Sequence, residues 1–297
     1  MRRYLITGIT GKIGSNILQF LDHFTHNDQV VAMVRDKNTV VGVNTICGDI
    51  RWQHSCDRAM KGVTDVIHLA AFVSFSDKDY INTWWTNFEG TRNLIRSAEK
   101  ENVKRFTFVS SALTRGIAMD PNYKVKVTDR KKNILLPPAY IESKLAAEQK
   151  LSTSLIPVQK VLYLTSANIA WFIDWYEKYP VVPCPPGGTS VIDPSDAALE
   201  VLYLHKYGTD QRAIVGSYNI SYYDLFSKIR EIHTIKKPII KIPQWSKKYA
   251  VKFASGKIMS RFNIQMVYHY KYFEMSHTLE RQTLDETIKR AITKEVL

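Results

Sequence analysis

The sequence predicts an α/β protein whose parallel sheet is covered by helices on both faces. Short apolar runs recur along the chain, and helix-like segments and a glycine-rich turn separate them. The runs are Tyr4–Thr7, Val30–Val34, Asp65–Leu69, Phe106–Ser110 and Val161–Leu164, and the helix-like segments are Ile13–Phe24, Asp79–Lys100 and Tyr140–Ser152. Because the runs are unbroken rather than alternating, they are typical of strands buried on both faces. Ligands of such a sheet bind at the carboxyl ends of its strands.

Length and composition indicate one large α/β domain with a smaller appended lobe. The chain has 297 residues, of which 45% are hydrophobic and 23% charged, as in ordinary globular proteins. A Pro- and Gly-rich stretch at 180–188 interrupts regular structure, and a helix-like Pro194–His205 and a strand-like Ala213–Val215 follow it. We expect residues 1–165 plus about 189–220 to form the sheet domain. Residues of about 166–188 plus 221–297 are then a mainly helical substrate-binding lobe.

Cysteine usage and the N-terminal sequence favour a reducing compartment. The three cysteines, Cys47, Cys56 and Cys184, form no C-x-x-C pair and have no histidine at metal-ligand spacing. We therefore expect neither a disulfide framework nor a metal site. The strand-like Tyr4–Thr7 is too short for the apolar core of a secretory signal, and the longest apolar stretch, Val161–Ile173, is too short to span a bilayer. The expected location is the cytoplasm.

The turn after the first strand predicts a dinucleotide site. Gly8, Gly11 and Gly14 are spaced three apart, directly before a helix. In a Rossmann-type turn the first glycine permits the tight bend, the second lets the pyrophosphate approach the backbone, and the third allows close helix–strand packing. The phosphates then bind the free N–H groups at the helix start. The expected contacts there are Gly8, Thr10, Gly11, Lys12, Ile13 and Gly14.

The end of the second strand bears on which cofactor binds. An acid at this position usually binds the ribose hydroxyls of NAD, whereas an arginine suits the 2′-phosphate of NADP. Arg35 stands there, with Asp36 directly after it. We favour NADP; NAD is the alternative if Asp36 faces the ribose, and a solvated charge pair is the structural alternative.

Two further strand ends are candidate cofactor contacts. Asp49 and Ile50 place a carboxylate where it can meet the adenine amino group, although a simple turn explains the pattern nearly as well. Small residues end the fourth strand, as expected where backbone passes close to a dinucleotide: Leu69, Ala70 and Ala71. His68 before them is expected to be a packed strand residue rather than an acid–base group.

A serine, a tyrosine and a lysine form the candidate catalytic set. Ser111 ends the next strand, and Tyr140 opens a helix 29 residues later with Lys144 one turn further. The four-residue spacing puts Tyr140 and Lys144 on one helical face, where an ammonium lowers the pKa of a phenol. Such a tyrosine exchanges a proton with a substrate oxygen near neutral pH, and Ser111 can donate a hydrogen bond to the same oxygen.

Taken together, these motifs resemble the extended short-chain dehydrogenase/reductase superfamily, also called the NAD-dependent epimerase/dehydratase family. The resemblance is densest over 65–111, including the segment Asn87–Asn93, and it continues through the Tyr140–Lys144 motif and Ala146-Ala147-Glu148. Within the family the sequence is most similar to the dihydroflavonol-reductase and 3β-hydroxysteroid-dehydrogenase-like branch. The Ser111–Arg115 stretch lacks the two acids of the sugar dehydratases, which argues against elimination of water.

The resemblance implies a mechanism and leaves the substrate open. NADPH would deliver hydride to a carbonyl carbon, Tyr140 would protonate its oxygen, Lys144 would hold the nicotinamide ribose, and Ser111 would orient the carbonyl. Asn87 would position water or backbone near the cofactor, with helix capping or kinking as the structural alternative. Leu164-Thr165-Ser166 replaces the family's usual Arg-Pro-Ser segment, and the long insert Thr114–Ala139 is a second place where the family's substrate specificity cannot be carried over.

Positive charge is concentrated near the C-terminus. The net charge is +13, and the range Ile232–Phe273 contains nine Lys and Arg without any Asp or Glu. Aromatic residues alternate with these cations, and Trp245, Tyr249 and Phe253 are spaced to form one apolar helix face. The favoured interpretation packs the aromatics inward with solvated lysines. Attraction of an anionic substrate and contact of the 236–273 segment with an anionic membrane surface are the alternatives.

The predicted function is an NADP-dependent oxidoreductase that acts on a carbonyl/hydroxyl pair of a small, hydrophobic substrate. One alternative is a nucleotide-sugar epimerase with bound NAD, and another is a redox-silent NADP-binding regulator. We expect a monomer or homodimer whose partner is a small-molecule substrate. Nucleic acid is not an expected partner, since no recognised binding module accompanies the charge.

Overall fold

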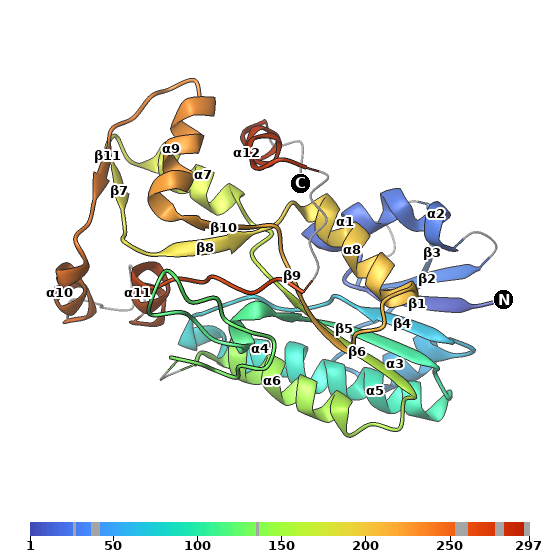
Figure 1. Cartoon of the computed structure of the whole chain (residues 1–297). Helices are drawn as coiled ribbons and strands as arrows, with labels where there is room; N and C mark the ends of the chain where they lie inside the picture. The colour runs from blue at the N-terminus through green and yellow to red at the C-terminus, as the bar shows by residue number, and fades with distance from the viewer. Residues whose placement is uncertain (26–27, 37–41, 135–136, 253–260, 277–281, 294–297) are drawn as a thin grey trace. The chain divides into compact units, whose positions relative to one another are not determined.

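The main feature of the computed structural model is a seven-stranded sheet in the order β3-β2-β1-β4-β5-β6-β9 (Figure 1). The strands are β1 (Arg3–Thr7), β2 (Gln29–Val34), β3 (Asn44–Cys47), β4 (Asp65–His68), β5 (Arg105–Ser111), β6 (Val158–Leu164) and β9 (Arg212–Val215). From β3 to β5 each strand pairs parallel with its neighbour. The predicted α/β, Rossmann-type fold is confirmed. The structure describes residues 1–25, 28–36, 42–134, 137–252, 261–276 and 282–293.

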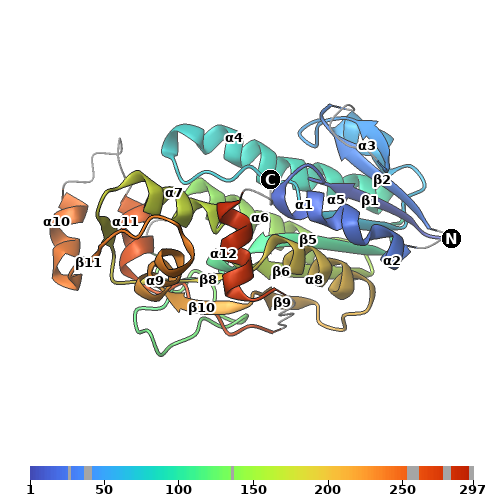
Figure 2. The same ribbon diagram turned by 90° about the horizontal axis from the view of Figure 1, so that it is seen from above.

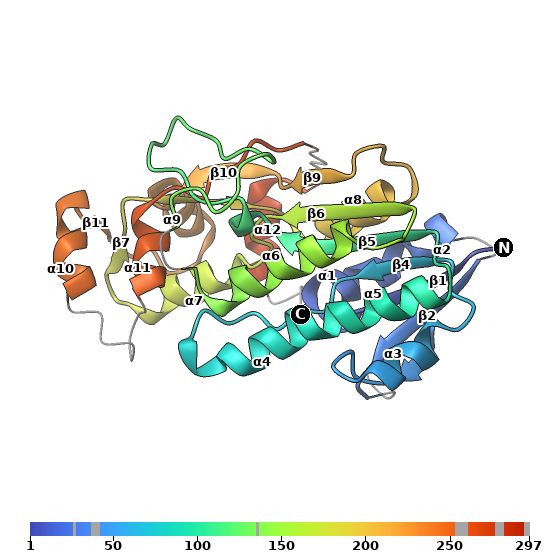
Figure 3. The same cartoon turned by 90° about the horizontal axis from the view of Figure 1, so that it is seen from below.

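Helices cover both faces of this sheet. On one face lie α1 (Lys12–Ile17), α2 (Leu21–Thr25) and α8 (Pro194–Lys206), seen from above in Figure 2. On the other lie α3 (Gln53–Met60), α4 (Tyr80–Trp84), α5 (Gly90–Lys100) and α6 (Ala139–Ser152), as Figure 3 shows. The strands between them are accordingly buried on both sides: every residue of β4 is buried, and so are six of the seven in β5.

The strand order creates a switch point between β1 and β4. From β1 the chain adds β2 and then β3 on one side, and it crosses to the other side for β4 and β5. The loops that leave β1 and β4 therefore diverge at the carboxyl ends of these two strands. In doubly wound sheets this divergence is where ligands bind.

Two predicted helices are interrupted. The segment expected at Ile13–Phe24 is divided by a 3-10 turn at Leu18–Phe20, and the segment expected at Asp79–Lys100 contains a π-helical turn at Trp85–Glu89. Hydrophobic periodicity does not reveal that one turn tightens to three residues or takes in an extra one, so neither break could be read from the sequence. Turns of the π type are frequent at functional sites.

The chain divides into two compact units. One comprises Met1–Thr114, Pro138–Tyr163 and Ala198–Ala213, and the other Arg115–Pro137, Leu164–Ala197 and Ile214–Leu297. The expected division differs from this one at 115–137, 164–165, 189–197 and 214–220, which the contacts group with the second unit. Within that unit the insert is tied by backbone hydrogen bonds in both directions between Ala118 and Tyr270.

The second unit has its own core. Its helices are α7 (Ala170–Lys178), α9 (Tyr222–Ile232), α10 (Lys247–Lys252), α11 (Arg261–Tyr268) and α12 (Leu284–Ile292). Its strands form two short pairs: β8 (Gly188–Val191) with β10 (Tyr218–Ser221), antiparallel, and β7 (Val182–Cys184) with β11 (Ile239–Lys241), parallel. The buried rings of Phe172, Tyr176, Tyr222 and Phe226 pack together in this core. Among the described residues of both units, no helix is long and apolar enough to cross a membrane.

Candidate active site

The loop after β1 lies directly against the loop after β4. A Cβ atom on Gly8 would come within 2.5 Å of the Ala70 backbone nitrogen, and Gly8 has a φ of +77°. A Cβ on Gly14 would lie 2.2 Å from the Gly8 carbonyl oxygen, to which the Gly11 N–H donates at 3.0 Å. Both positions therefore require glycine, one for its backbone conformation and both for the close approach.

The start of α1 fits a pyrophosphate group. Gly11 precedes this helix without a side-chain cap, and the first turn contains no acidic residue. The N–H groups of a first helical turn have no partner within the helix, and an anion satisfies them. Thr10, Gly11 and Lys12 are exposed, while Ile13 is half-buried and Gly14 buried. The residues predicted to bind the cofactor thus provide an accessible anion-binding turn.

An arginine pair surrounds Asp49 near the ends of β2 and β3. The Asp49 carboxylate accepts hydrogen bonds from Arg51 Nε at 2.9 Å and Nη2 at 2.6 Å. It also accepts one from the backbone N–H of Arg51 at 2.9 Å. Burial raises the pKa of Asp49, but the Arg51 hydrogen bonds and the Arg51 and Arg35 charges outweigh it and lower the pKa overall. Asp49 is therefore held as a paired carboxylate, whereas Arg35 and Asp36 are exposed.

Ile50 is placed differently from Asp49. Its side chain is buried, and a Cβ on Gly90 of α5 would come within 2.7 Å of it. Its carbonyl oxygen accepts a hydrogen bond from Asn93 Nδ2 at 3.1 Å. Ile50 thus anchors the loop that presents Asp49 against α5.

A buried polar chain joins the ends of β1 and β4. His68 Nδ1 lies 2.6 Å from Thr7 Oγ1, and His68 Nε2 lies 2.8 Å from Thr91 Oγ1. Burial, with a smaller effect of the Lys144 charge, lowers the pKa of His68 to about 3. His68 is therefore neutral and is a packed strand residue, as predicted. Thr7 Oγ1 also accepts the Ala70 N–H at 3.4 Å, a role that the sequence did not reveal.

Asn87 fixes the backbone that follows Leu69, Ala70 and Ala71. Its Oδ1 accepts the Phe72 N–H at 2.7 Å, and its Nδ2 donates to the Phe72 carbonyl at 2.9 Å. The same Nδ2 lies 3.3 Å from Ser143 Oγ on α6. Asn87 is 1% exposed and lies in the π-helical turn. Its amide thus positions backbone beside the expected cofactor loop.

Ser111, Tyr140 and Lys144 come together at the carboxyl end of β5. The Ser111 side chain lies near enough to the Tyr140 phenol to oppose the rise of its pKa, and the Tyr140 ring meets Phe75 edge-on with centroids 5.4 Å apart. Lys144 Nζ donates to the Val109 carbonyl at 2.9 Å and lies 4.6 Å from the centroid of the Phe108 ring. All three members of the predicted set are buried in the first unit.

The electrostatics of this set differ from the prediction. Burial raises the pKa of Tyr140 and outweighs the opposing effect of the Ser111 hydrogen bond, so the expected lowering by Lys144 is wrong for this structure. Burial also lowers the pKa of Lys144 to about 7, against the attraction of Glu148. The helical spacing predicted proximity correctly, but the removal of both groups from water dominates their titration.

Glu148 is a buried member of the site that sequence reasoning did not single out. It lies one turn after Lys144 on α6, and its Oε1 accepts a hydrogen bond from Ser110 Oγ at 2.6 Å. Its Oε2 lies 3.4 Å from the Tyr163 hydroxyl of β6. The signal was present in the chain, because 140, 144 and 148 repeat every four residues along one helix face.

The segment that replaces the Arg-Pro-Ser pattern is bound by its backbone. The Thr165 N–H donates to the Val215 carbonyl at 3.0 Å, and the Ser166 N–H donates to the Ser190 carbonyl at 3.2 Å. Both bonds lie within the second unit.

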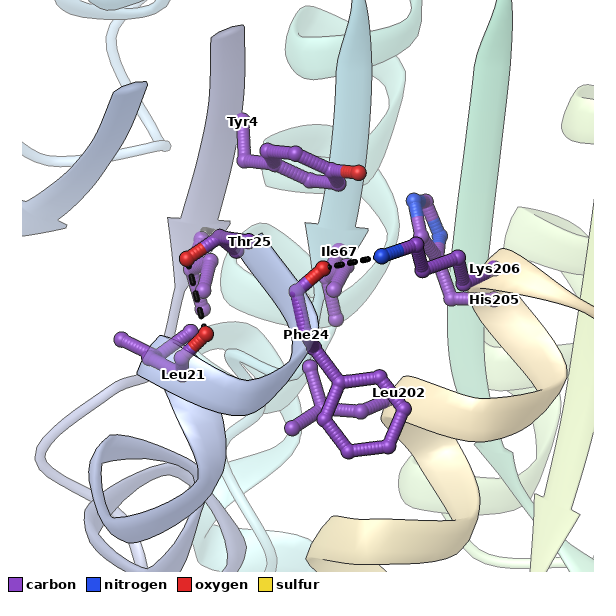
Figure 4. Close-up of a pocket in the computed structure, with 9 residues that line it drawn as sticks. Tyr4, Leu21, Phe24, Thr25, Ile67, Leu202, His205 and Lys206 are labelled. Atoms are coloured by element: carbon purple, nitrogen blue, oxygen red, sulfur yellow. Dashed lines mark hydrogen bonds between the residues drawn. The ribbon is translucent and has the colours of Figure 1, made fainter. Parts of the chain in front are cut away.

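A separate apolar pocket lies at the opposite end of β1. Tyr4, Leu21, Phe24, Leu202 and neighbouring side chains line it, and Lys206 Nζ donates to the Phe24 carbonyl beside it (Figure 4). Tyr4 is near the amino end of β1, whereas the glycine turn follows its carboxyl end. This pocket therefore belongs to the packing between α2, α8 and the sheet and is distinct from the candidate site.

The basic C-terminal segment divides into buried and exposed aromatics. Phe262, Tyr268 and Phe273 are buried, as the favoured interpretation requires. Trp245 and Tyr249 are 68% and 48% exposed, so the expected inward-facing stripe is wrong for them. Phe253, the third residue of that stripe, lies outside the described residues. The four-residue spacing predicted that these aromatics share one helix face. It could not predict whether another element of the protein would pack against that face.

A family model for the NAD dependent epimerase/dehydratase family matches residues 4–154, half of the chain. The chain belongs to this family. The match covers the glycine turn, Asn87 and the set of Ser111, Tyr140 and Lys144. The resemblance inferred from the motifs is thereby confirmed.

Two curated relatives are similar over very different lengths. "Sterol demethylase protein B" of Methylococcus capsulatus is 33% identical over 118 residues, which are 38% of this chain and 35% of that protein, so this match spans about a third of the relative. A protein of Synechocystis sp. named "Putative dihydroflavonol 4-reductase" is 23% identical over 99% of this chain and 93% of its own length.

Solved structures share the fold over almost the whole chain. The crystal structure of gox2253 has a TM-score of 0.82 at 21% identity and covers 99% of this chain and 97% of its own. The NAD complex of UDP-glucose 4-epimerase from Thermus thermophilus has a TM-score of 0.74 at 16% identity and covers 98% of both chains. At these identities the likeness establishes the architecture.

Proposed function

We propose that this protein is an oxidoreductase that transfers a hydride between NADP and a carbonyl/hydroxyl group of a small hydrophobic substrate. The observation that supports it most is the neighbouring pair Ser111 and Tyr140 with Lys144 one helical turn away, all buried at the carboxyl end of β5. Membership of the family supports a nicotinamide cofactor, and the glycine turn fits the pyrophosphate of that cofactor. The names of the two curated relatives, which refer to a sterol and a dihydroflavonol, support a hydrophobic substrate.

The protein residues would act on the substrate oxygen. When bound, the nicotinamide supplies or accepts the hydride. Tyr140, whose pKa is raised by burial, is protonated at neutral pH and is the proton donor for carbonyl reduction. Ser111, beside the same phenol, would orient the oxygen and stabilise the charge that develops on it. Lys144 in its charged form would favour the phenolate left after proton transfer.

Charge near β2 supports NADP over NAD. Arg35 is exposed at the end of this strand, and the nearest described acid on β3's loop, Asp49, is already paired with Arg51. A guanidinium offers several hydrogen bonds to a 2′-phosphate, whereas an unpaired carboxylate would repel it. Arg35 is therefore the guanidinium that this edge offers to a phosphorylated ribose, and the exposed Asp36 beside it is the carboxylate that would favour NAD instead.

Tyr140→Phe tests the chemistry. The variant lacks only the phenol hydroxyl, so we expect NADP binding by calorimetry to be unchanged and turnover of a carbonyl substrate to fall by about 10²–10⁴-fold. Tyr4→Phe, which removes another buried hydroxyl of the same unit at the opposite end of β1, is the matched control and should retain most activity. Normal turnover by Tyr140→Phe would refute the assignment. NAD that copurifies with the protein, with no net redox change, would support the epimerase instead.

Arg35→Ala tests the cofactor. Loss of charge-assisted hydrogen bonds of about 1.5–3 kcal/mol predicts an affinity for NADP that is about 10–100-fold weaker, with NAD affinity unchanged. Equal loss for both cofactors, or stronger binding of NAD by the unaltered protein, contradicts the NADP preference. NADP binding without any turnover of carbonyl substrates would instead favour a redox-silent regulator.

We place the activity in the cytoplasm, since all three cysteines are free thiols.

A further inference from the structure

The exposed aromatics of the basic segment form a pair at the start of α10. Trp245 lies in a 3-10 turn at Gln244–Ser246, and its ring meets that of Tyr249 edge-on, with centroids 6.1 Å apart. Single exposed apolar residues are ordinary, whereas exposed apolar groups that gather in one patch mark an interaction site. Because Phe262 and Tyr268 of the same basic segment are buried, exposure distinguishes Trp245 and Tyr249 from the core-forming aromatics.

Exposed apolar side chains also lie on the β7–β11 pair, which precedes the Trp245 turn in the chain. Ile240, on β11, is 60% exposed and stands opposite Pro183 of β7. Val181, the residue before β7, is 39% exposed. The Ile242 N–H donates to the Cys184 carbonyl at 2.7 Å, which keeps the end of β11 attached to β7 just before the Trp245 turn. The chain then enters α10 directly, as Figure 1 shows.

Lysines flank these apolar groups in the sequence, and the range from Ile232 to Phe273 contains no Asp or Glu. Lys241 Nζ lies 3.7 Å from the centroid of the Tyr223 ring, and Lys248 Nζ lies 5.0 Å from that of Tyr249. Lys247 Nζ is 2.5 Å from His269 Nε2. In the part of the chain that the structure describes, none of these three lysines forms an ion pair with a carboxylate. Lys241 and Lys248 are exposed, so their charges are available to an anionic partner, whereas Lys247 is half-buried against His269.

We propose that Ile240, Lys241, Trp245, Lys247, Lys248 and Tyr249, the 240–249 surface, bind the anionic phospholipid surface of a membrane. Tryptophan and tyrosine combine an apolar ring with a polar group and concentrate at the level of lipid headgroups. Isoleucine inserts among acyl chains, and lysines bind the anionic phosphates. Nucleic acid fits less well, since it would bind the lysines and leave Ile240 and Val181 unused. The proposal does not depend on the chemistry at Tyr140.

Vesicle sedimentation of the full chain tests the proposal. We expect binding to phosphatidylcholine vesicles that contain about 30% phosphatidylserine, weaker binding to pure phosphatidylcholine, and a loss in high salt. Each lysine near such a surface contributes about a fivefold change in partitioning, so Lys241→Glu with Lys248→Glu should weaken it at least about 25-fold. Trp245→Ala should weaken binding by removal of the inserted ring, about tenfold.

Matched variants on the first unit serve as controls. Lys61 and Lys104 are exposed, so Lys61→Glu with Lys104→Glu repeats the charge change elsewhere. Trp52 is 58% exposed, so Trp52→Ala repeats the loss of an exposed ring. Equal weakening by the control variants would overturn the proposal, as would equal binding to neutral and anionic vesicles. Competition by single-stranded DNA together with full vesicle binding by Trp245→Ala would show a general polyanion surface and would also overturn it.

Discussion

Replacement of Lys144 by methionine separates the stability of the site from its activity. Lys144 is 2% exposed, and its pKa is lowered from 10.5 to about 7 by burial. Methionine keeps the unbranched stem and removes the charge. We therefore expect Lys144→Met to lose activity. We also expect its free energy of unfolding to be free of the decrease that the lowered pKa of Lys144 causes in the wild type.

The pKa shift fixes the direction and size of this effect. Between pH 7 and 10.5 the unfolded chain binds the Lys144 proton more tightly than the folded protein does, so stability rises with pH across this window. Compared with a residue that never carries a charge, protonation of Lys144 lowers the free energy of unfolding by about 4 kcal/mol at pH 7 and by about 2 kcal/mol at pH 9. The methionine variant also loses the hydrogen bond to Val109, at a cost that is the same at both pH values.

Urea unfolding of both proteins at pH 7 and pH 9 provides the measurement. The stability difference, variant minus wild type, should fall by about 2 kcal/mol from pH 7 to pH 9, because wild type alone gains stability from the Lys144 equilibrium. Lys104→Met, at an exposed lysine, should show no such change. A difference for Lys144→Met that is identical at both pH values would refute the argument that burial controls this lysine.

Two further substitutions test the scaffold around the cofactor. Gly14→Ala places a methyl group 2.2 Å from the Gly8 carbonyl oxygen, so the turn must open, and calorimetry should show NADP binding at least about tenfold weaker together with a lower Tm. Retained affinity and Tm would show that the turn adapts. Asn87→Ala leaves the N–H and carbonyl of Phe72 without their partner, which should cost about 1–3 kcal/mol in urea unfolding and lower kcat. Unchanged stability there would show that water replaces the amide.

Local patterns were sufficient for most of the sheet and for the choice of site residues. Unbroken apolar runs located β1, β2, β4, β5 and β6 to within a few residues, because strands buried on both faces must be apolar throughout. The short β3, half-exposed along most of its length, carries a weaker signal, and the sequence did not delimit it. The π-helical turn around Asn87 was likewise invisible, since one added residue shifts a helix face without altering its composition.

The sequence by itself determined the glycine turn, because that turn depends on local backbone conformation. It also determined the strand after which each motif lies, and the helical repeat that places Tyr140 and Lys144 on one face. Only the tertiary structure decided how those groups titrate. The chain buries Tyr140 and Lys144 together, which raises the pKa of the phenol and lowers that of the amine. Desolvation depends on every element packed around a group, and no local pattern contains that information.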